Sequence, residues 1–256
     1  MGWLFGESPM SDEKIIADDL IVLGNAVPDI ISDQRITVCT VGFASHFGLI
    51  RIYPVPALSN MKRWNVVEVP LERNPKDTRQ ESWKLQGSKW EWNKLSAKIQ
   101  LKGTITDRSE QRALLDKLHS MFGAQCVEEF NDKKVSLGMI RPQVVGYNLE
   151  KREDYESIAQ TQLGWVTPFL TIKNYPLKPV IEYRCPNCKT KNPHKQQVVE
   201  WGVFEWMRRN PNAPEKVWEN LHLMDAGYDR SFLVGNMALH RNSFMVISIF
   251  RPKLNA

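Results

Sequence analysis

The sequence predicts an α+β protein with a small β-barrel-like domain, accompanied by helices, followed by a smaller domain around a C-x2-C pair. Closely spaced runs of alternating and β-branched residues between 35 and 73 indicate short strands of a barrel. An amphipathic repeat at 108–122 indicates a helix, and the cysteine pair stands in the turn-rich stretch YRCPNCKTKNPH, which is typical of a zinc ribbon. We therefore expect a helical lead-in at 1–34, the barrel-like domain at 35–150, a linker or helix at 151–178 and a zinc-ribbon-like domain at 179–256.

The first elements are expected to change from helix to strand near residue 35. Ser11 is a candidate N-cap before an apolar repeat with Asp12 and Glu13 in its first turn, which favours a helix over residues 12–32. The runs RITVCTVGF, GLIRIYPVP and RWNVVEVPLER then predict three consecutive strands, bounded by Gly, Pro or Asn, that curl into the barrel.

The helix expected at 108–122 has Ser109 as a candidate cap and Gly123 as its stop. Residues 135–147 return to strand-like composition, and the polar run EKREDYESIAQTQ is a helix or a linker.

Length and hydropathy favour a globular, cytoplasmic protein. The chain has 256 residues with 42% hydrophobic and 25% charged residues, values close to those of globular proteins that bury a core. Its longest apolar runs are far shorter than a membrane span, and the N-terminus does not resemble a secretory signal. We therefore expect no membrane association.

The cysteine count is too low for a disulfide framework. Of the four cysteines, Cys185 and Cys188 form the C-x2-C pair, whereas Cys39 and Cys126 stand alone and are interpreted as buried thiols of the core.

A resemblance supports treating these pieces as one protein. The segments TVCTVG, GLIRIYPVP, VEVPLERNPKDTRQESW, SLGMIRP, PLKPVIEYRC, FLVGN and SFMVISIFRP resemble a family of bacterial and archaeal proteins with a C-terminal Cys/His segment and no assigned activity, over roughly residues 35–252. The resemblance implies no function. It implies that the Cys/His segment falls on Cys185, Cys188 and His194, followed by Glu200 beside Trp201.

The C-x2-C pair is interpreted as half of a zinc site. Two cysteines separated by Pro186-Asn187 can turn back on one ion, because this dipeptide favours a tight turn. A redox pair is the alternative, but it would normally follow a strand and begin a helix.

Histidines are the candidates for the remaining ligands. His194 is nearest in sequence, and His240 in the turn MALHRNSF is the preferred fourth ligand, with His222 as second choice. A site of Cys185, Cys188, His194 and His240 would be closed and structural. If one ligand is left out, Glu200 could act as general base beside a metal-bound water, but the H-x-E and P-C-x-x-C pattern of deaminases is absent.

Positive charge gathers in one segment together with indole rings. Residues 60–108 contain eleven Lys and Arg against six Asp and Glu, an excess equal to the whole chain's +5. Lys and Arg bind phosphates and aromatic rings stack on unpaired bases, so this mixture suits single-stranded DNA or RNA. The alternative is a solvated basic face over buried tryptophans. The candidate contacts are Lys62, Arg63, Trp64, Arg73, Arg79, Trp83, Lys84, Lys89 and Trp90.

We therefore expect a nucleic-acid-binding accessory protein with a structural zinc site, acting beside a larger protein partner. A metal-dependent nuclease or hydrolase is the first alternative, for which Glu68, Glu72 or Glu182 could supply carboxylates. A protein-interaction adaptor, whose basic face binds an acidic partner, is the second.

Overall fold

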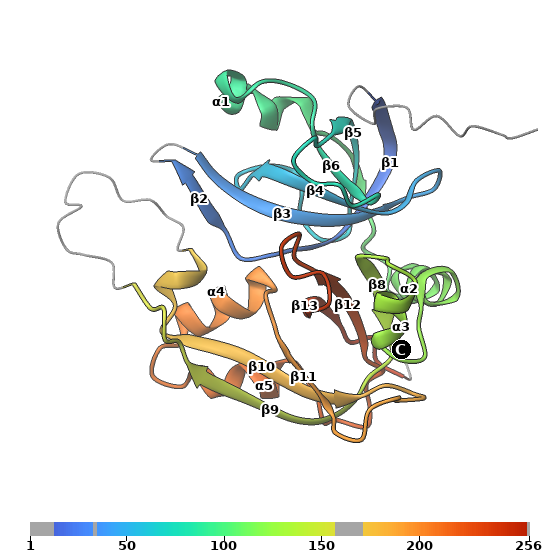
Figure 1. Ribbon diagram of the computed structural model, residues 1–256, viewed down its shortest axis with the longest axis vertical. Helices are drawn as coiled ribbons and strands as arrows, with labels where there is room; N and C mark the ends of the chain where they lie inside the picture. Colours follow the sequence, from blue (N-terminus) through green and yellow to red (C-terminus); the bar gives the residue numbers. More distant parts are fainter. Residues whose placement is uncertain (1–12, 33–34, 157–170, 255–256) are drawn as a thin grey trace, which may run out of the picture.

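Five strands near the N-terminus close into a barrel. The computed structural model describes residues 13–32, 35–156 and 171–254. The barrel order is β1-β3-β4-β6-β5, and β1 pairs again with β5 to complete the circuit (Figure 1). The parallel pair is β4 with β6, and the other neighbours are antiparallel. The strands are β1 (Lys14–Asn25), β3 (Arg35–Ala44), β4 (Gly48–Pro56), β5 (Asn65–Arg73) and β6 (Ser82–Leu85).

The helix predicted at 12–32 was wrong. Its described part forms β1 and the short β2 (Asp29–Ser32), and Ser11 and Asp12 lie outside the described residues. The pairing of β1 with β5 shifts register between Ala17 and Leu20, where a bulge adds a residue to the strand. Ala17, Leu20 and Val22 are fully buried in the barrel core, and the bulge places Ala17 and Leu20 three residues apart, a spacing that also occurs on one face of a helix.

The three strands predicted between residues 35 and 73 are confirmed as β3, β4 and β5. Beyond the circuit, β2 pairs with β3 and β7 (Gln100–Thr104) pairs with β5. A short helical stretch after β6 comprises η1 (Lys89–Glu91), α1 (Trp92–Leu95) and η2 (Ser96–Lys98).

Helix α2 (Arg108–Phe122) confirms the predicted helix with its bounds. Its N-cap is Asp107, whose side chain accepts a hydrogen bond from the Glu110 backbone N–H, rather than the predicted Ser109. The helix ends at Gly123, as predicted.

Two three-stranded antiparallel sheets form the C-terminal part, in the orders β11-β10-β9 and β13-β12-β8. The described chain is mostly β with few helices, and the cysteine turn joins β10 and β11 within the first of these sheets. Residues 157–170 of the predicted linker lie outside the described residues. The elements are α3 (Glu128–Asp132), β8 (Leu137–Ile140), β9 (Gln143–Lys151), η3 (Ile172–Asn174), β10 (Leu177–Arg184), β11 (His194–Gln197), α4 (Trp201–Arg209), η4 (Pro214–Lys216), α5 (Val217–Asn220), β12 (Ser231–Asn236) and β13 (Phe244–Phe250).

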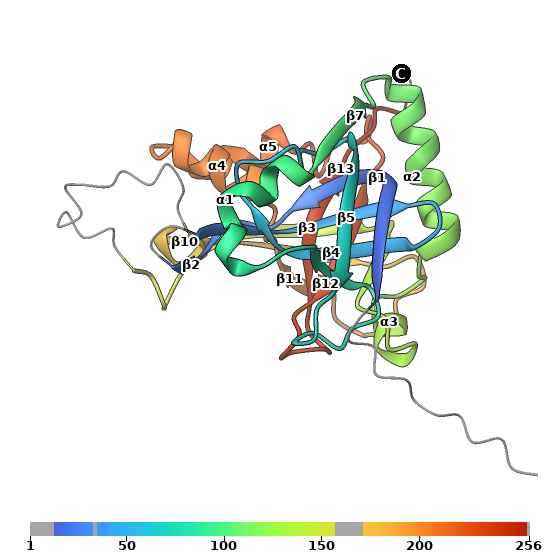
Figure 2. The ribbon, with the colours of Figure 1, turned by 90° about the horizontal axis from the view of Figure 1, so that it is seen from above.

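The barrel and the C-terminal sheets share one apolar core. Leu23 and Phe43 of the barrel pack in the same buried cluster as Leu118 of α2 and Leu233 and Ile247 of the second sheet. Figure 2 shows α2 running beside both halves. At one contact between the halves, a Cβ on Gly24 would lie 2.9 Å from the Ser248 side chain, so glycine is favoured there. The two halves therefore meet through close packing.

Within residues 13–32, 35–156 and 171–254, none of the helices has the length and apolar character needed to cross a bilayer.

Candidate metal centre and cationic clefts

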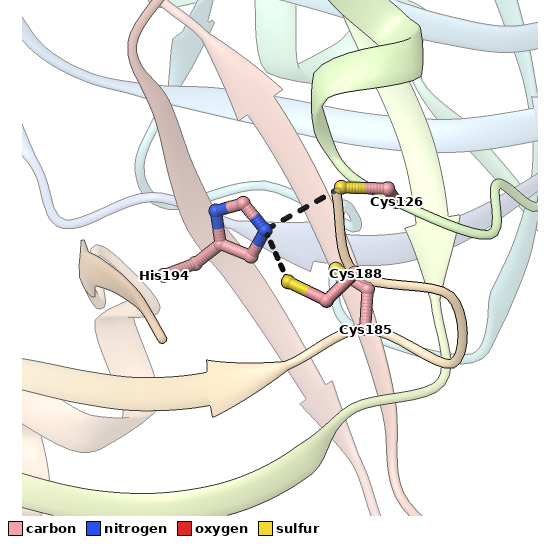
Figure 3. Close-up of side chains that lie close together, drawn as sticks. All are labelled: Cys126, Cys185, Cys188 and His194. Atoms are coloured by element: carbon pink, nitrogen blue, oxygen red, sulfur yellow. Dashed lines mark hydrogen bonds between the residues drawn. The ribbon is translucent and has the colours of Figure 1, made fainter. Parts of the chain in front are cut away.

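Three separate segments bring four metal-ligating side chains together. Cys126 lies in the loop between α2 and α3, Cys185 follows the last residue of β10, and His194 begins β11 (Figure 3). Cys188 lies in the turn that joins the two strands. The ligand atoms all lie within 4.8 Å of one another, so this group can bind a metal ion.

The distances suit tetrahedral coordination. The His194 Nε2 atom is 3.2 Å from the Cys188 Sγ and 3.5 Å from the Cys126 Sγ. A tetrahedral zinc ion with bonds of about 2.0 to 2.3 Å separates its ligand atoms by roughly 3.5 to 3.8 Å. The sulfurs and the nitrogen therefore need to move only slightly to bind one ion.

Surrounding groups orient these ligands. The Val127 backbone N–H donates to the Cys185 Sγ at 3.4 Å, and the Lys189 N–H donates to the Cys126 Sγ at 3.5 Å. The Nδ1 of His194 is 3.8 Å from a Glu128 carboxylate oxygen, which leaves Nε2 turned towards the thiols. A carboxylate behind a histidine is the usual outer partner of a metal-binding imidazole.

The thiols differ in acidity. Burial raises the pKa of Cys185 to about 12. Burial also acts to raise the pKa of Cys188, but hydrogen bonds from Thr190 and from the backbone outweigh it and lower that pKa. Desolvation lowers the pKa of His194, which favours the neutral imidazole that a metal requires. Neutral His194 can bind a metal ion directly, whereas Cys185 loses its proton only when a nearby cation stabilises the thiolate.

The ligand set differs from the sequence-based choice at two positions. Cys126 is fully buried in the core, as predicted, but its sulfur also belongs to the cluster, which was not predicted. His240 lies in the turn between β12 and β13 and is not part of the cluster. That turn is instead tied to the barrel, because the Arg241 guanidinium donates to the Thr78 hydroxyl at 2.5 Å. Nothing in the local sequence around Cys126 marks it as a ligand, since its partners follow about 60 residues later.

Neither of the other residues considered for metal chemistry joins the cluster. His222 stacks on Tyr228 with ring centroids 4.2 Å apart. Glu200 is buried, and its carboxylate accepts hydrogen bonds from the Arg63 guanidinium and, at 2.7 Å, from the Ile249 backbone N–H. Glu200 therefore ties the two halves together and is no base beside the cluster.

Most of the basic residues predicted to bind nucleic acid have partners within the protein. Arg73 pairs with Glu13 at 2.8 Å, Arg79 pairs with Asp77 at 2.5 Å, and Lys84 pairs with Glu72 at 2.5 Å; Arg63 holds Glu200, as above. Lys62 is exposed. The side chain of Lys89 lies outside the described part of the structure.

The three predicted tryptophans have different surroundings. Trp83 is buried in the barrel core, with the Arg73 guanidinium 3.8 Å above its ring. Trp64 is half-buried against Phe250, with centroids 5.3 Å apart. Trp90 is 86% exposed. Trp64 and Trp83 are therefore much less exposed to solvent than Trp90.

Two cationic clefts remain on the surface. The first, here called the barrel cleft, has a volume of about 540 Å³ and is lined by Arg35, Tyr53, Lys76, Arg79 and Lys84 among others. The second, here called the junction cleft, has a volume of about 350 Å³ and is lined by residues of both halves, including Arg63, Arg108, Arg112, Arg251 and Lys253. The barrel cleft is therefore lined by two of the residues predicted to contact nucleic acid, Arg79 and Lys84.

The fold and the cluster define a two-part, mostly β protein with a closed five-stranded barrel and a Cys3His group able to bind a metal ion. Residues 117–256 match the family described as Domain of unknown function (DUF8757), and the chain belongs to this family. Residues 17–117 match a second family, Domain of unknown function (DUF8758), so the two matches divide the chain inside α2. None of the curated proteins compared with the chain matches it.

Proposed function

We propose that this protein binds single-stranded nucleic acid at the barrel cleft and holds a structural zinc ion at the Cys3His cluster. The zinc proposal is supported by the donor set, because three thiolates and one imidazole are typical ligands of structural zinc. Four protein ligands complete a tetrahedral shell and leave no position for a water. The ion would therefore stabilise the fold and take no part in a reaction.

The order of the barrel strands carries the nucleic-acid proposal. Numbered within the barrel alone, the strands follow 1-2-3-5-4 and return to 1, with the third and fifth parallel, which is the connectivity of an OB-fold. OB-folds bind oligonucleotides across the face of their second and third strands and the adjoining loops. Function does not follow from a fold, so this argument is an analogy that the surface chemistry has to support.

The barrel cleft lies at the corresponding place. Arg35 begins the second barrel strand, Tyr53 lies on the third, and Lys76 lies in the loop between the fourth and the fifth. Lys76 is exposed, and the described residues form no ion pair with it. A cationic groove with an aromatic side chain is the surface that single strands require.

The surroundings of the acidic candidates do not favour the nuclease alternative. Glu72 pairs with Lys84, and Glu68 pairs with Lys102 at 2.7 Å. Carboxylates neutralised in this way do not form a divalent-cation site. A binding role beside a larger protein partner therefore remains our proposal.

Elemental analysis tests the zinc centre. Protein purified without chelator should contain about one zinc per chain, and Cys126→Ser should lower that content strongly because it removes one of four ligands. Cys39→Ser is the matched control, since Cys39 lies outside the cluster. Metal-free parent protein, or full zinc content in the Cys126 variant, would contradict the proposal.

Titration with labelled oligonucleotides tests the barrel cleft. Lys76→Gln should weaken binding to single strands of every sequence and reduce the slope of log affinity against log salt by about one. Tyr53→Leu should weaken binding by about 1 to 3 kcal/mol if its ring stacks on a base. Lys151→Gln removes an equal charge on β9 and should change nothing. A parent protein that binds no strand at low salt would refute this function.

A further inference from the structure

The junction cleft is built from four segments of both halves. Arg63 and Trp64 come from the turn before β5, Arg108 and Arg112 from the first turns of α2, and Tyr228 from the loop after α5. The end of β13 and the residues after it, 249–253, form another wall, and His222 lies beside Tyr228. No residue of this cleft lines the barrel cleft.

Five cationic side chains line this cleft, and no Asp or Glu is among its lining residues. Arg63 is matched by Glu200, whose second oxygen is occupied by the Ile249 backbone N–H. The remaining four form no ion pair with any residue that the structure describes: Arg108, Arg112, Arg251 and Lys253.

The rest of the molecule differs, because most arginines outside this cleft pair with a carboxylate. Arg251 is half-buried, and this burial lowers the pKa of its guanidinium; Glu200 opposes the effect, and Arg63 adds to it. Holding several like charges together without counterions costs free energy that a bound anion would recover.

Backbone contacts hold the walls in place. The Arg112 guanidinium donates to the backbone carbonyls of Lys253 and Leu254, each at 3.1 Å. The Leu254 N–H donates to the Gly227 carbonyl at 2.9 Å, and the Asp229 N–H donates to the Pro252 carbonyl at 2.9 Å. The segment carrying Arg251 and Lys253 is therefore fixed against both α2 and the loop of Tyr228, so the cations are positioned before any ligand binds.

We propose that the junction cleft binds the di- or triphosphate group of a nucleotide, through Arg108, Arg251 and Lys253. Arginine binds phosphate oxygens with two parallel hydrogen bonds, and lysine adds a compact charge. A single phosphodiester carries one negative charge, too few to match four unpaired cations, whereas a polyphosphate presents several charges on adjacent groups. The polyphosphate can belong to a free nucleotide or to the 5′ end of a strand, and both present the same chemistry.

Isothermal titration of the full-length protein with inorganic triphosphate tests this site. Triphosphate should bind much more tightly than sulfate, and the Arg251→Gln, Lys253→Gln double variant should weaken binding about tenfold or more, because each lost charge-assisted contact lowers the affinity. Lys151→Gln removes a positive charge on β9, outside the residues that line the cleft, and this variant should bind like the parent. Arg108→Gln changes an exposed residue at the start of α2 and should weaken binding even if the double variant proves unstable.

Further titrations distinguish the two sources of the ligand. ATP binding as tightly as inorganic triphosphate points to a free nucleotide. Tighter binding of a 5′-triphosphorylated oligonucleotide than of its 5′-hydroxyl counterpart, lost in the double variant, points to a strand end. The proposal is overturned if the parent binds triphosphate no better than sulfate, or if neither the double variant nor Arg108→Gln weakens binding. Because Lys76 lies outside this cleft, failure of the barrel-cleft proposal would leave this result unaffected.

Discussion

The barrel and the C-terminal sheets hold themselves together by different means. The barrel closes through strand pairing all the way round and fills its interior with apolar side chains such as Leu20, Ile52 and Trp83. Each C-terminal sheet has only three strands and does not close. In the first of these sheets, the hairpin of β10 and β11 carries Cys185, Cys188 and His194, which meet Cys126 of a separate loop in one cluster of metal-ligating side chains. The comparison predicts that the barrel is stable without metal, whereas the hairpin depends on the metal ion that we propose for the cluster.

Metal removal should therefore produce the largest effect, and it should be local. If the cluster holds the proposed zinc ion, its removal by a chelator should make backbone amides around Cys126 and in β10 and β11 exchange with deuterium much faster, because the bonds that join these segments through the metal are lost. Amides of β3 and β4 should remain protected. Hydrogen exchange followed by mass spectrometry measures both regions in one sample.

Equal loss of protection in the barrel and in the hairpin would contradict the comparison. The shared apolar core would then transmit the whole effect, and the two halves would unfold as one unit. Readdition of zinc provides the control, because it should restore protection in the hairpin.

The sequence predicted elements that have clear local signals. Strands β3, β4 and β5 are runs of β-branched and alternating residues bounded by Gly, Pro or Asn, helix α2 has an amphipathic repeat, and all four were predicted. Strand β1 was missed because its bulge changes the spacing of buried residues from two to three. The closure of the barrel through β1 and β5 is a long-range pairing that no local pattern reveals.

The same limit applies to the candidate site. The C-x2-C pair and the nearby His194 are local features, and the structure brings their side chains together. Cys126 joins them only because α2 and the following loop pack beside β10, where the Asn187 N–H donates to the Gln125 carbonyl at 3.0 Å. The sequence also shows an excess of cations in residues 60–108, but it does not reveal that the fold pairs all three predicted arginines, Arg63, Arg73 and Arg79, with carboxylates.

A second prediction concerns the link between the halves. Glu200→Gln should lower the free energy of unfolding by about 1 to 3 kcal/mol, because a neutral amide cannot match the charge of Arg63 and one of its atoms donates instead of accepting. Glu68→Gln is the control: it breaks the more exposed pair with Lys102 and should cost less than about 1 kcal/mol. Chemical denaturation of both variants measures the difference, and equal costs would show that Glu200 adds nothing special at the junction.

The smallest expected effect comes from replacing His119 on α2. The replacement separates the loss of stability in acid that His119 causes from the loss that the metal centre causes. Burial, aided by the nearby Arg141, lowers the pKa of His119 to about 4 from 6.5, against the opposing charges of Asp229 and Asp116. Its Nε2 lies 2.8 Å from the Ser231 hydroxyl. Because the folded state disfavours the protonated ring, its contribution to stability is complete above pH 6.5 and is lost as the pH falls towards 4.

Replacement by asparagine, which can still bond to the Ser231 hydroxyl, should therefore flatten the decline in unfolding free energy between pH 6.5 and 4 relative to the parent. Both proteins contain the same Cys3His cluster, so acid loss of a bound metal cancels in the difference between their curves. Denaturation at a series of pH values measures that difference. Parallel curves would mean that His119 titrates alike in the folded and unfolded chains, and the acid sensitivity would then have to arise from other groups, the metal ligands first among them.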